Sequence, residues 1–113
     1  MKIPKPTAED KARFESLVPR DARVEVKPMF GNLGAFVNGN MFMGLFGSDV
    51  GVKLDETAQG ALSKAGGGAF GPAERPMGGY VSLPATFTQA EAKTWIATSL
   101  AYVSALPPKS KKR

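Results

Sequence analysis

Residues 24–54, with the sequence VEVKPMFGNLGAFVNGNMFMGLFGSDVGVKL, decide the fold of this chain. Three turn signals separate four short apolar runs in this stretch: residues 31–34 (GNLG), Asn38-Gly39 and residues 47–49 (GSD). An Asn-Gly pair between apolar runs is a strong hairpin signal, because both central residues of a type I′ turn need a positive φ angle. The stretch therefore predicts an antiparallel meander of four strands.

The first strand of this meander is the most regular. Val24 and Val26 alternate with Glu25 and Lys27, a pattern typical of a sheet with one face in water. Pro28 follows and cannot donate a backbone hydrogen bond, so we expect it at a sheet edge, a bulge or a strand end. The other three strands are predicted at about residues 33–37, 41–46 and 51–54.

The third strand alternates poorly. Its sequence, MFMGLF over residues 41–46, is apolar on both sides. A strand of this kind must be covered on both faces, and we expect a helix on one face and a partner chain on the other. This strand is therefore the reason to expect a homodimer.

Two helices are predicted, one before and one after the meander. Thr7 can cap the first, which should run to about residue 18 and end at Pro19. Asp55 can cap the second, which should run to about residue 65 and stop at the glycines of residues 66–68. The second helix is expected to turn these residues inward: Ala58, Ala61, Leu62 and Ala65.

The C-terminal helix has the clearest helical pattern in the chain. Thr88 and Glu91 make a Thr-x-x-Glu capping box, and Phe87 is placed to pack on Ala92. The inward stripe then follows at helical spacing: Ala92, Trp95, Ile96, Ser99, Leu100, Val103 and Leu106.

With short strands at residues 69–70 and 80–83, the chain is predicted to be an α+β protein. We expect two layers, an antiparallel meander sheet of five or six strands and three helices.

The basic charge of the chain is concentrated at its ends. A length of 113 residues suits one domain, which we place at residues 7–107 between a flexible leader (1–6) and a basic flexible tail (108–113). The formal net charge is +5, and the two ends carry Lys2, Lys5, Lys109, Lys111, Lys112 and Arg113. Between them, nine basic residues face ten acidic ones, so the body has a net charge of −1. This balance argues against a broad basic face.

The residue types argue against catalysis. The chain has no His and no Cys, which removes the usual general base, thiol nucleophile and zinc ligands. Carboxylates are scattered, and none are spaced so that they must converge. We therefore expect no catalytic residues, no metal site and no cofactor, and predict that the chain is not an enzyme. A small-ligand enzyme is the least favoured reading, and it would need a closed pocket around Lys53 or Tyr80.

The expected location is the cytoplasm. The chain has no cysteines for disulfides and no visible secretory leader. No apolar run approaches the roughly 20 residues that cross a bilayer, so no membrane association is expected.

A weak nucleic-acid-associated module is the main alternative function. Aromatic residues of the sheet can act as base-stacking platforms, although core packing is the favoured reading of Phe30, Phe36, Phe42, Phe46 and Tyr80. Stacking platforms need basic residues on the same face, and the meander offers only Lys27 and Lys53. The basic tail suits phosphate contacts or a solvated terminus equally well. Candidate interaction residues are Lys27, Asn32, Lys53, Arg75, Lys109, Lys111, Lys112 and Arg113.

Several motifs together resemble the signature of the TfoX N-terminal domain family. In the first half these are MFG at residues 29–31, Gly34, FVNGNMF at residues 36–42 and VKL at residues 52–54. In the second half they are Phe70, Met77, YVSLP at residues 80–84, and the Trp95 helix that continues to Leu106-Pro107. The resemblance covers about residues 14–107.

The resemblance implies an α+β domain with a layered antiparallel sheet, a fold likened to secretion-chaperone-like proteins. It implies no known catalytic activity and no agreed catalytic residues. Full-length members of the TfoX/Sxy group regulate natural competence together with a cyclic-AMP-dependent transcription activator, and carry a second, C-terminal domain of DNA-binding character. Asn32 stands where the family often has a second glycine, which predicts a left-handed backbone there.

The leading hypothesis is a non-enzymatic regulatory or protein-interaction domain of TfoX N-terminal type. It is expected to be a homodimer and to have a protein partner in transcription regulation.

Overall fold

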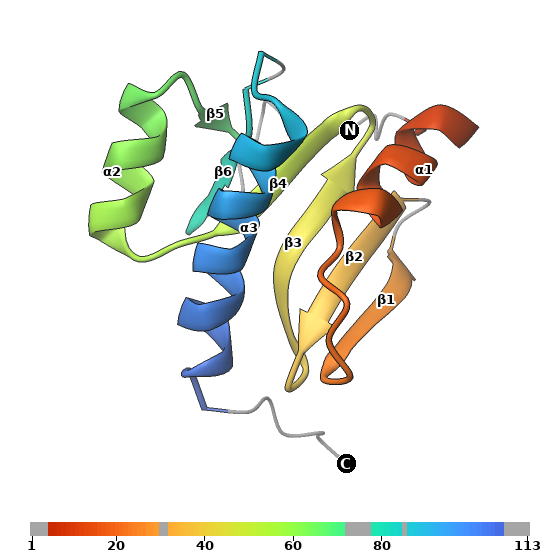
Figure 1. Ribbon diagram of the computed structural model, residues 1–113, viewed down its shortest axis with the longest axis horizontal. Coiled ribbons are helices and arrows are strands. Elements are labelled where there is room, and N and C mark those ends of the chain that lie inside the picture. Colours follow the sequence, from red (N-terminus) through yellow and green to blue (C-terminus); the bar gives the residue numbers. More distant parts are fainter. Residues whose placement is uncertain (1–4, 30–31, 72–77, 85, 108–113) are drawn as a thin grey trace.

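A computed structural model describes residues 5–29, 32–71, 78–84 and 86–107 of the chain. Within these residues, three helices cover a six-stranded antiparallel sheet, which confirms the predicted α+β fold (Figure 1). In chain order the elements are α1 (Ala8–Leu17), β1 (Val24–Met29), β2 (Asn32–Val37), β3 (Asn40–Phe46), β4 (Asp49–Lys53), α2 (Glu56–Lys64), β5 (Gly68–Ala69), β6 (Tyr80–Ser82) and α3 (Gln89–Ser104).

The predicted meander forms the larger part of the sheet. The strand order is β1-β2-β3-β4-β6-β5, and each of β1 to β4 pairs with its neighbour in the chain. Asn38 and Gly39 have φ angles of 54° and 81°, as a type I′ turn requires. Pro28 lies in β1, an edge strand, where its missing N–H leaves no gap in an inner ladder.

The N-terminal ends of α1 and α3 are each fixed by a reciprocal cap. In α3 the backbone N–H of Glu91 donates to Thr88 Oγ1 at 3.1 Å, and the N–H of Thr88 donates to Glu91 Oε1 at 2.8 Å. The capping box predicted there is confirmed. In α1, Thr7 makes the same reciprocal pair with Asp10, whose short side chain replaces the more usual Glu.

Helix α2 packs differently from the prediction. Asp55 caps it, and Gly66 follows its end with a φ angle of +113°, both as expected. The expectation that Ala61 and Ala65 face inward is wrong, because both are exposed. The helix lies beside β6 near the edge of the sheet, so only a narrow stripe with the fully buried Leu62 reaches the core.

A bulge explains why the sequence of β3 does not alternate. Ala35 pairs with Met43 and Phe36 pairs with Met41, so Phe42 has no partner on β2. The extra residue lets two consecutive side chains, Phe42 and Met43, enter the same core. The carbonyl of Phe42 accepts a hydrogen bond from Ser99 Oγ of α3 at 2.6 Å, so the irregular point of the strand is tied to the helix.

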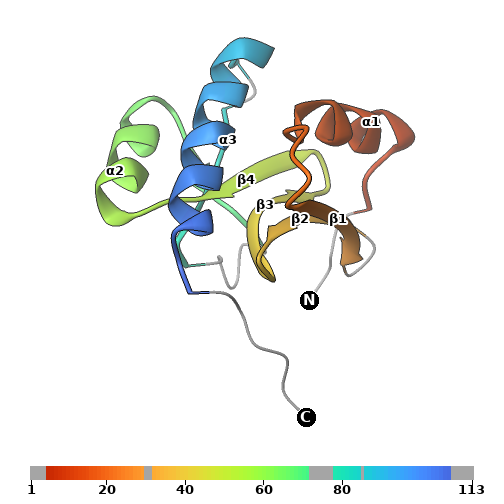
Figure 2. The same cartoon turned by 60° about the horizontal axis from the view of Figure 1, so that its bottom comes forward.

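Helices α1 and α3 lie on the same side of the sheet (Figure 2). The core between them and the sheet includes Phe14 and Leu17 of α1, and Ile96 and Val103 of α3. The stripe predicted for α3 is confirmed, since Ala92, Ile96, Ser99 and Val103 are buried and Trp95, Leu100 and Leu106 are partly buried. This packing fixes the two helices relative to each other, and their exposed sides frame the site described next.

Candidate functional site

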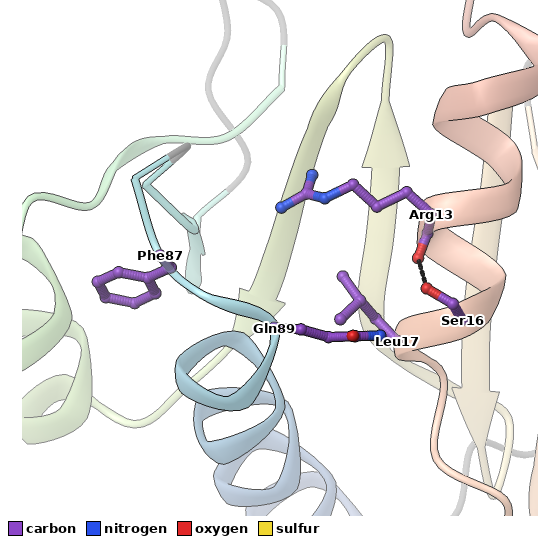
Figure 3. A pocket seen from close by; sticks show the side chains of 5 residues that line it. All are labelled: Arg13, Ser16, Leu17, Phe87 and Gln89. Atoms are coloured by element: carbon purple, nitrogen blue, oxygen red, sulfur yellow. Dashed lines mark hydrogen bonds between the residues drawn. The ribbon is translucent and has the colours of Figure 1, made fainter.

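Two adjoining cavities lie between α1 and α3, and we call them together the α1–α3 groove. They have volumes of about 280 and 460 Å³ and share Ser16 and Leu17 of α1. Figure 3 shows the smaller one, with Arg13 of α1 on one side and Phe87 and Gln89 at the start of α3 on the other. The larger one is lined by Ser16, Leu17, Val18, Pro19, Arg20, Lys93, Ile96 and Ala97.

Helical spacing builds both walls of the α1–α3 groove. On the α1 side, Arg13, Ser16 and Leu17 are three or four residues apart along the helix, and Arg20 extends this wall beyond the end of α1. On the α3 side, Gln89, Lys93, Ile96 and Ala97 do the same. The stretch from residue 89 to residue 97 corresponds to about 12 Å of helix, at a rise of about 1.5 Å per residue. The groove is therefore short, about two helical turns in length.

The floor of the groove is apolar and its rim is basic. Leu17 and Ile96 are 2% and 1% exposed and form part of the floor. Arg13, Arg20 and Lys93 are exposed. Among the described residues, the ion pairs are Arg23–Asp21 and Lys27–Glu25, so none of the three rim cations has a carboxylate partner there. This side of the molecule can attract an anionic group over a hydrophobic surface.

The other face of the sheet is covered mainly by aromatic side chains, and we call it the aromatic face. It consists of the rings of Phe36, Phe46, Phe70 and Tyr80 together with Met41. Gly34 pairs with Gly44, and Gly44 with Gly51, so three glycines form a row across β2, β3 and β4. Phe70, just after β5, packs over Gly44 and Gly51 of this row, and a Cβ atom at Gly51 would overlap its ring. The ring centroids of Phe46 and Tyr80 lie 6.2 and 6.1 Å from that of Phe70.

This packing removes the reason for expecting a homodimer. The strand β3 is apolar on both sides, but its second side is covered by the same chain. Met41 is 8% exposed and Phe70 is 2% exposed. Among the described residues, the only large hydrophobic side chain counted as exposed is Val26, at 41%, on the edge strand β1. The expectation of a partner chain over β3 did not take account of Phe70, which lies 24 or more positions after this strand in the chain and covers its second side.

Lys27 and Lys53, both candidate interaction residues, do share a face of the sheet with aromatic rings. Lys27 Nζ lies 5.3 Å from the centroid of Phe36, and Lys53 Nζ lies 5.2 Å from that of Tyr80. Lys27 Nζ is also 3.6 Å from Glu25 Oε1, an exposed ion pair that reduces the local positive charge. Each lysine therefore already has an interaction within the chain.

Asn32 lies in β2 and is 3% exposed. Its Oδ1 accepts a hydrogen bond at 2.9 Å from the backbone N–H of Gly47, so it ties the start of β2 to the β3–β4 turn. The left-handed backbone predicted at Asn32 is wrong, because among the described non-glycine residues only Asn38 has a positive φ angle. The prediction compared Asn32 with the glycine that the family often has at this position. It failed because Asn32 is part of strand β2 and not of the preceding turn.

Five other candidate interaction residues lie outside the described residues: Arg75, Lys109, Lys111, Lys112 and Arg113. The rim cations Arg13, Arg20 and Lys93 were not singled out from the sequence. One signal was available on α1, where Arg13 stands four residues before Leu17, on the same side of the helix. Nothing in the sequence places Lys93 across from the two arginines, because that depends on how the two helices pack.

Tyr80 serves the packing of the aromatic face. Its hydroxyl donates a hydrogen bond to the carbonyl of Met41 at 2.8 Å, across β4. Burial raises the pKa of Tyr80 to about 12, so the phenol stays neutral near pH 7. Among the described residues, no three acidic side chains are grouped so as to hold a metal ion.

No described helix is long and apolar enough to cross a membrane.

Comparison with known proteins assigns the chain to a family. Searches among curated proteins and among solved structures gave no match. The family model described as the TfoX N-terminal domain matches residues 8–103, from the first residue of α1 to near the end of α3. Because this match spans nearly all of the chain, the protein belongs to the TfoX N-terminal domain family.

Proposed function

We propose that this chain is a non-enzymatic, cytoplasmic regulatory domain that acts by binding another protein through the α1–α3 groove. The observation that carries the proposal is the combination of an apolar floor at Leu17 and Ile96 with a rim of exposed cations that have no carboxylate partner among the described residues. Interfaces of this kind have a hydrophobic centre and a polar, charged rim.

The groove is also rigid enough for recognition. The larger part of each wall belongs to a helix that begins with a reciprocal cap, and both helices insert large side chains into the core. A surface that is already ordered loses little conformational entropy when a partner binds. A protein in transcription regulation is the first partner to test, because the TfoX/Sxy group, which the sequence resembles, acts together with a transcription activator.

Photo-crosslinking tests the proposal. A photoreactive phenylalanine analogue is placed at Ala97, which is exposed in the groove, or at Thr57, which is exposed on α2. Crosslinking in the native cells should give a discrete adduct with a transcription-associated protein at position 97 and no such adduct at position 57. Identical adducts at both positions, or none at position 97, would show that the groove is not the binding surface.

Nucleic-acid association is the second candidate function. One observation favours it, namely that Lys27 and Lys53 lie on the same face of the sheet as Phe36, Phe46 and Tyr80. Such a face resembles the stacking platforms of single-strand binders. Gel shifts with single-stranded DNA and RNA at low salt, using the full chain and a chain without residues 108–113, test this candidate. Binding that survives removal of the tail and is lost in Lys27→Glu/Lys53→Glu would support it, and no binding at low salt would exclude it.

A further inference from the structure

We propose that the α1–α3 groove takes a short acidic segment of the partner protein, with apolar side chains between its carboxylates. This inference rests on the proposed function and specifies the chemistry of its ligand. It is carried by three features of the groove: its charge, its floor and its length.

The charge selects an anion. Arg13 lies on α1 and Arg20 follows the end of this helix, and Lys93 lines the groove from α3. Within the described part of the chain, none of these cations is engaged by a carboxylate. Carboxylates of a ligand can therefore pair with them without breaking an existing ion pair. Guanidinium groups also bind carboxylates through two parallel hydrogen bonds, which adds geometric selectivity.

The floor selects a ligand that is also apolar. Leu17 and Ile96 are nearly buried, and Val18 and Ala97 extend the apolar lining toward solvent. The larger cavity, at about 460 Å³, has room for one or two aliphatic side chains of a ligand. Burial of those side chains supplies affinity, whereas the charged rim supplies orientation and a faster association rate.

These features favour a protein segment over a polyanion. The body of the domain, between residues 7 and 108, has a net charge of −1, which does not favour the approach of a long phosphate backbone. Among the residues that line the groove, Phe87 is the one aromatic side chain, so successive bases have little to stack on. A groove of about 12 Å matches two turns of an acidic amphipathic helix or about four extended residues.

A pair of designed peptides provides the test. The acidic probe is a fluorescent peptide of about twelve residues with Leu at helical spacing and Glu between. The basic probe replaces every Glu with Lys. Binding is measured by fluorescence anisotropy at low salt for the wild-type chain, for Arg13→Glu/Lys93→Glu and for a matched control, Lys11→Glu/Lys64→Glu. The control makes the same change in net charge at exposed residues that do not line the groove.

We expect the wild-type chain to prefer the acidic probe. The Arg13→Glu/Lys93→Glu variant should bind it on the order of tenfold more weakly and should gain affinity for the basic probe. The Lys11→Glu/Lys64→Glu control should stay close to the wild type. An equal loss in both variants, or no preference between the probes, would overturn the inference. Circular dichroism of each variant verifies that it is folded.

Three further experiments complete the test. They compare the acidic segment with other ligands, check that it binds in the groove, and distinguish a failure of this inference from a failure of the proposed function. A single-stranded oligonucleotide or an anionic vesicle that displaces the acidic probe from the wild-type groove with higher affinity would overturn the choice of a protein ligand. Filling the groove with Ser16→Trp, at an exposed residue that lines both cavities, should abolish binding of the acidic probe, and unchanged binding would also overturn the inference. If position 97 still crosslinks a specific protein while the acidic probe fails, the acidic assignment is wrong and the interaction function stands.

Discussion

The two faces of the sheet are both apolar, but they are covered in different ways. On the helix side, large side chains of β3 and β4 meet those of α1 and α3 in one continuous apolar core, which includes Phe14 and Phe42. On the aromatic side, Gly44 and Gly51 of the glycine row let Phe70 approach the sheet closely. The bulge at Phe42 allows one strand to serve both arrangements. An apolar strand without alternation therefore does not by itself indicate a partner chain.

The two faces also differ in what they leave open. The aromatic face is covered by its own rings, and Lys27 and Lys53 lie over two of them. The helix side is closed at the core but leaves the α1–α3 groove between its two helices. We therefore expect recognition on the helix side and structural packing on the aromatic side. The following substitutions test this contrast.

The largest contrast should come from two phenylalanines of β3. Phe42 is fully buried on the helix side, whereas Phe46 is partly exposed on the aromatic side. Phe42→Ala should lower the free energy of unfolding by about 3–5 kcal/mol, the usual cost of emptying a core position. Phe46→Ala should cost about 1–2 kcal/mol, because less of its surface is buried. Urea denaturation measures both, and equal costs would show that the two faces are packed alike.

The glycine row should tolerate no side chain beneath Phe70. Gly51→Ala should cost about 1–3 kcal/mol, since its Cβ atom would overlap the ring. Gly34→Ala should cost less, because its Cβ atom would lie 3.0 Å from Met41 Sδ and from Phe36 Cε1, which is a tight contact but not an overlap. In a double-mutant cycle with Phe70→Ala, the penalty of Gly51→Ala should shrink. A penalty that is unchanged without the ring would mean that Phe70 does not lie on the glycine row.

Tyr80 should give the aromatic face its own dependence on pH. Loss of the hydrogen bond to Met41 in Tyr80→Phe should cost about 1 kcal/mol at neutral pH. The folded-state pKa of about 12 lies above the ordinary value of 10.0, so the folded chain holds this proton more tightly than the unfolded chain. The contribution of Tyr80 to stability should be constant below pH 10 and should be lost as the pH rises from 10 to 12. Tyr80→Phe should fall less over this range when followed by circular dichroism, and an identical fall would exclude Tyr80 as the cause.

The smallest expected effect is a gain in stability outside both faces. Gly60 lies in the interior of α2, and a Cβ atom there would meet nothing within 4 Å. Gly60→Ala should therefore stabilise the chain by about 0.5–1 kcal/mol through helix propensity alone. Thermal denaturation measures this change. A loss of stability would indicate that α2 has a contact at Gly60 that the structure does not show.

Local signals were sufficient to predict most of the elements. The Asn38-Gly39 turn, the Thr88–Glu91 capping box and the caps of α1 and α2 each depend on residues close together in the chain. The strand boundaries were less accurate. The strand β4 begins at Asp49, two residues before the predicted start, because its pairing with Phe46 continues up to the turn.

Features that depend on register or on helix packing were not predicted. Gly34, Gly44 and Gly51 form a row only after the bulge shifts the pairing of β2 with β3. Arg13 and Lys93 are eighty residues apart and share a groove only because Leu17 and Ile96 enter the same core. The family resemblance, by contrast, could be stated from motifs alone, and the family match over residues 8–103 confirms it.

The assignment of recognition to the helix side can be tested most directly by NMR. The acidic peptide is titrated into the ¹⁵N-labelled chain, and shifts of the backbone amides are followed. We expect the largest shifts at residues 13–20 and 89–97, with Lys53 and Tyr80 unchanged. Shifts centred on β1, β4 and β6, with α1 and α3 unaffected, would place recognition on the aromatic face and contradict this assignment.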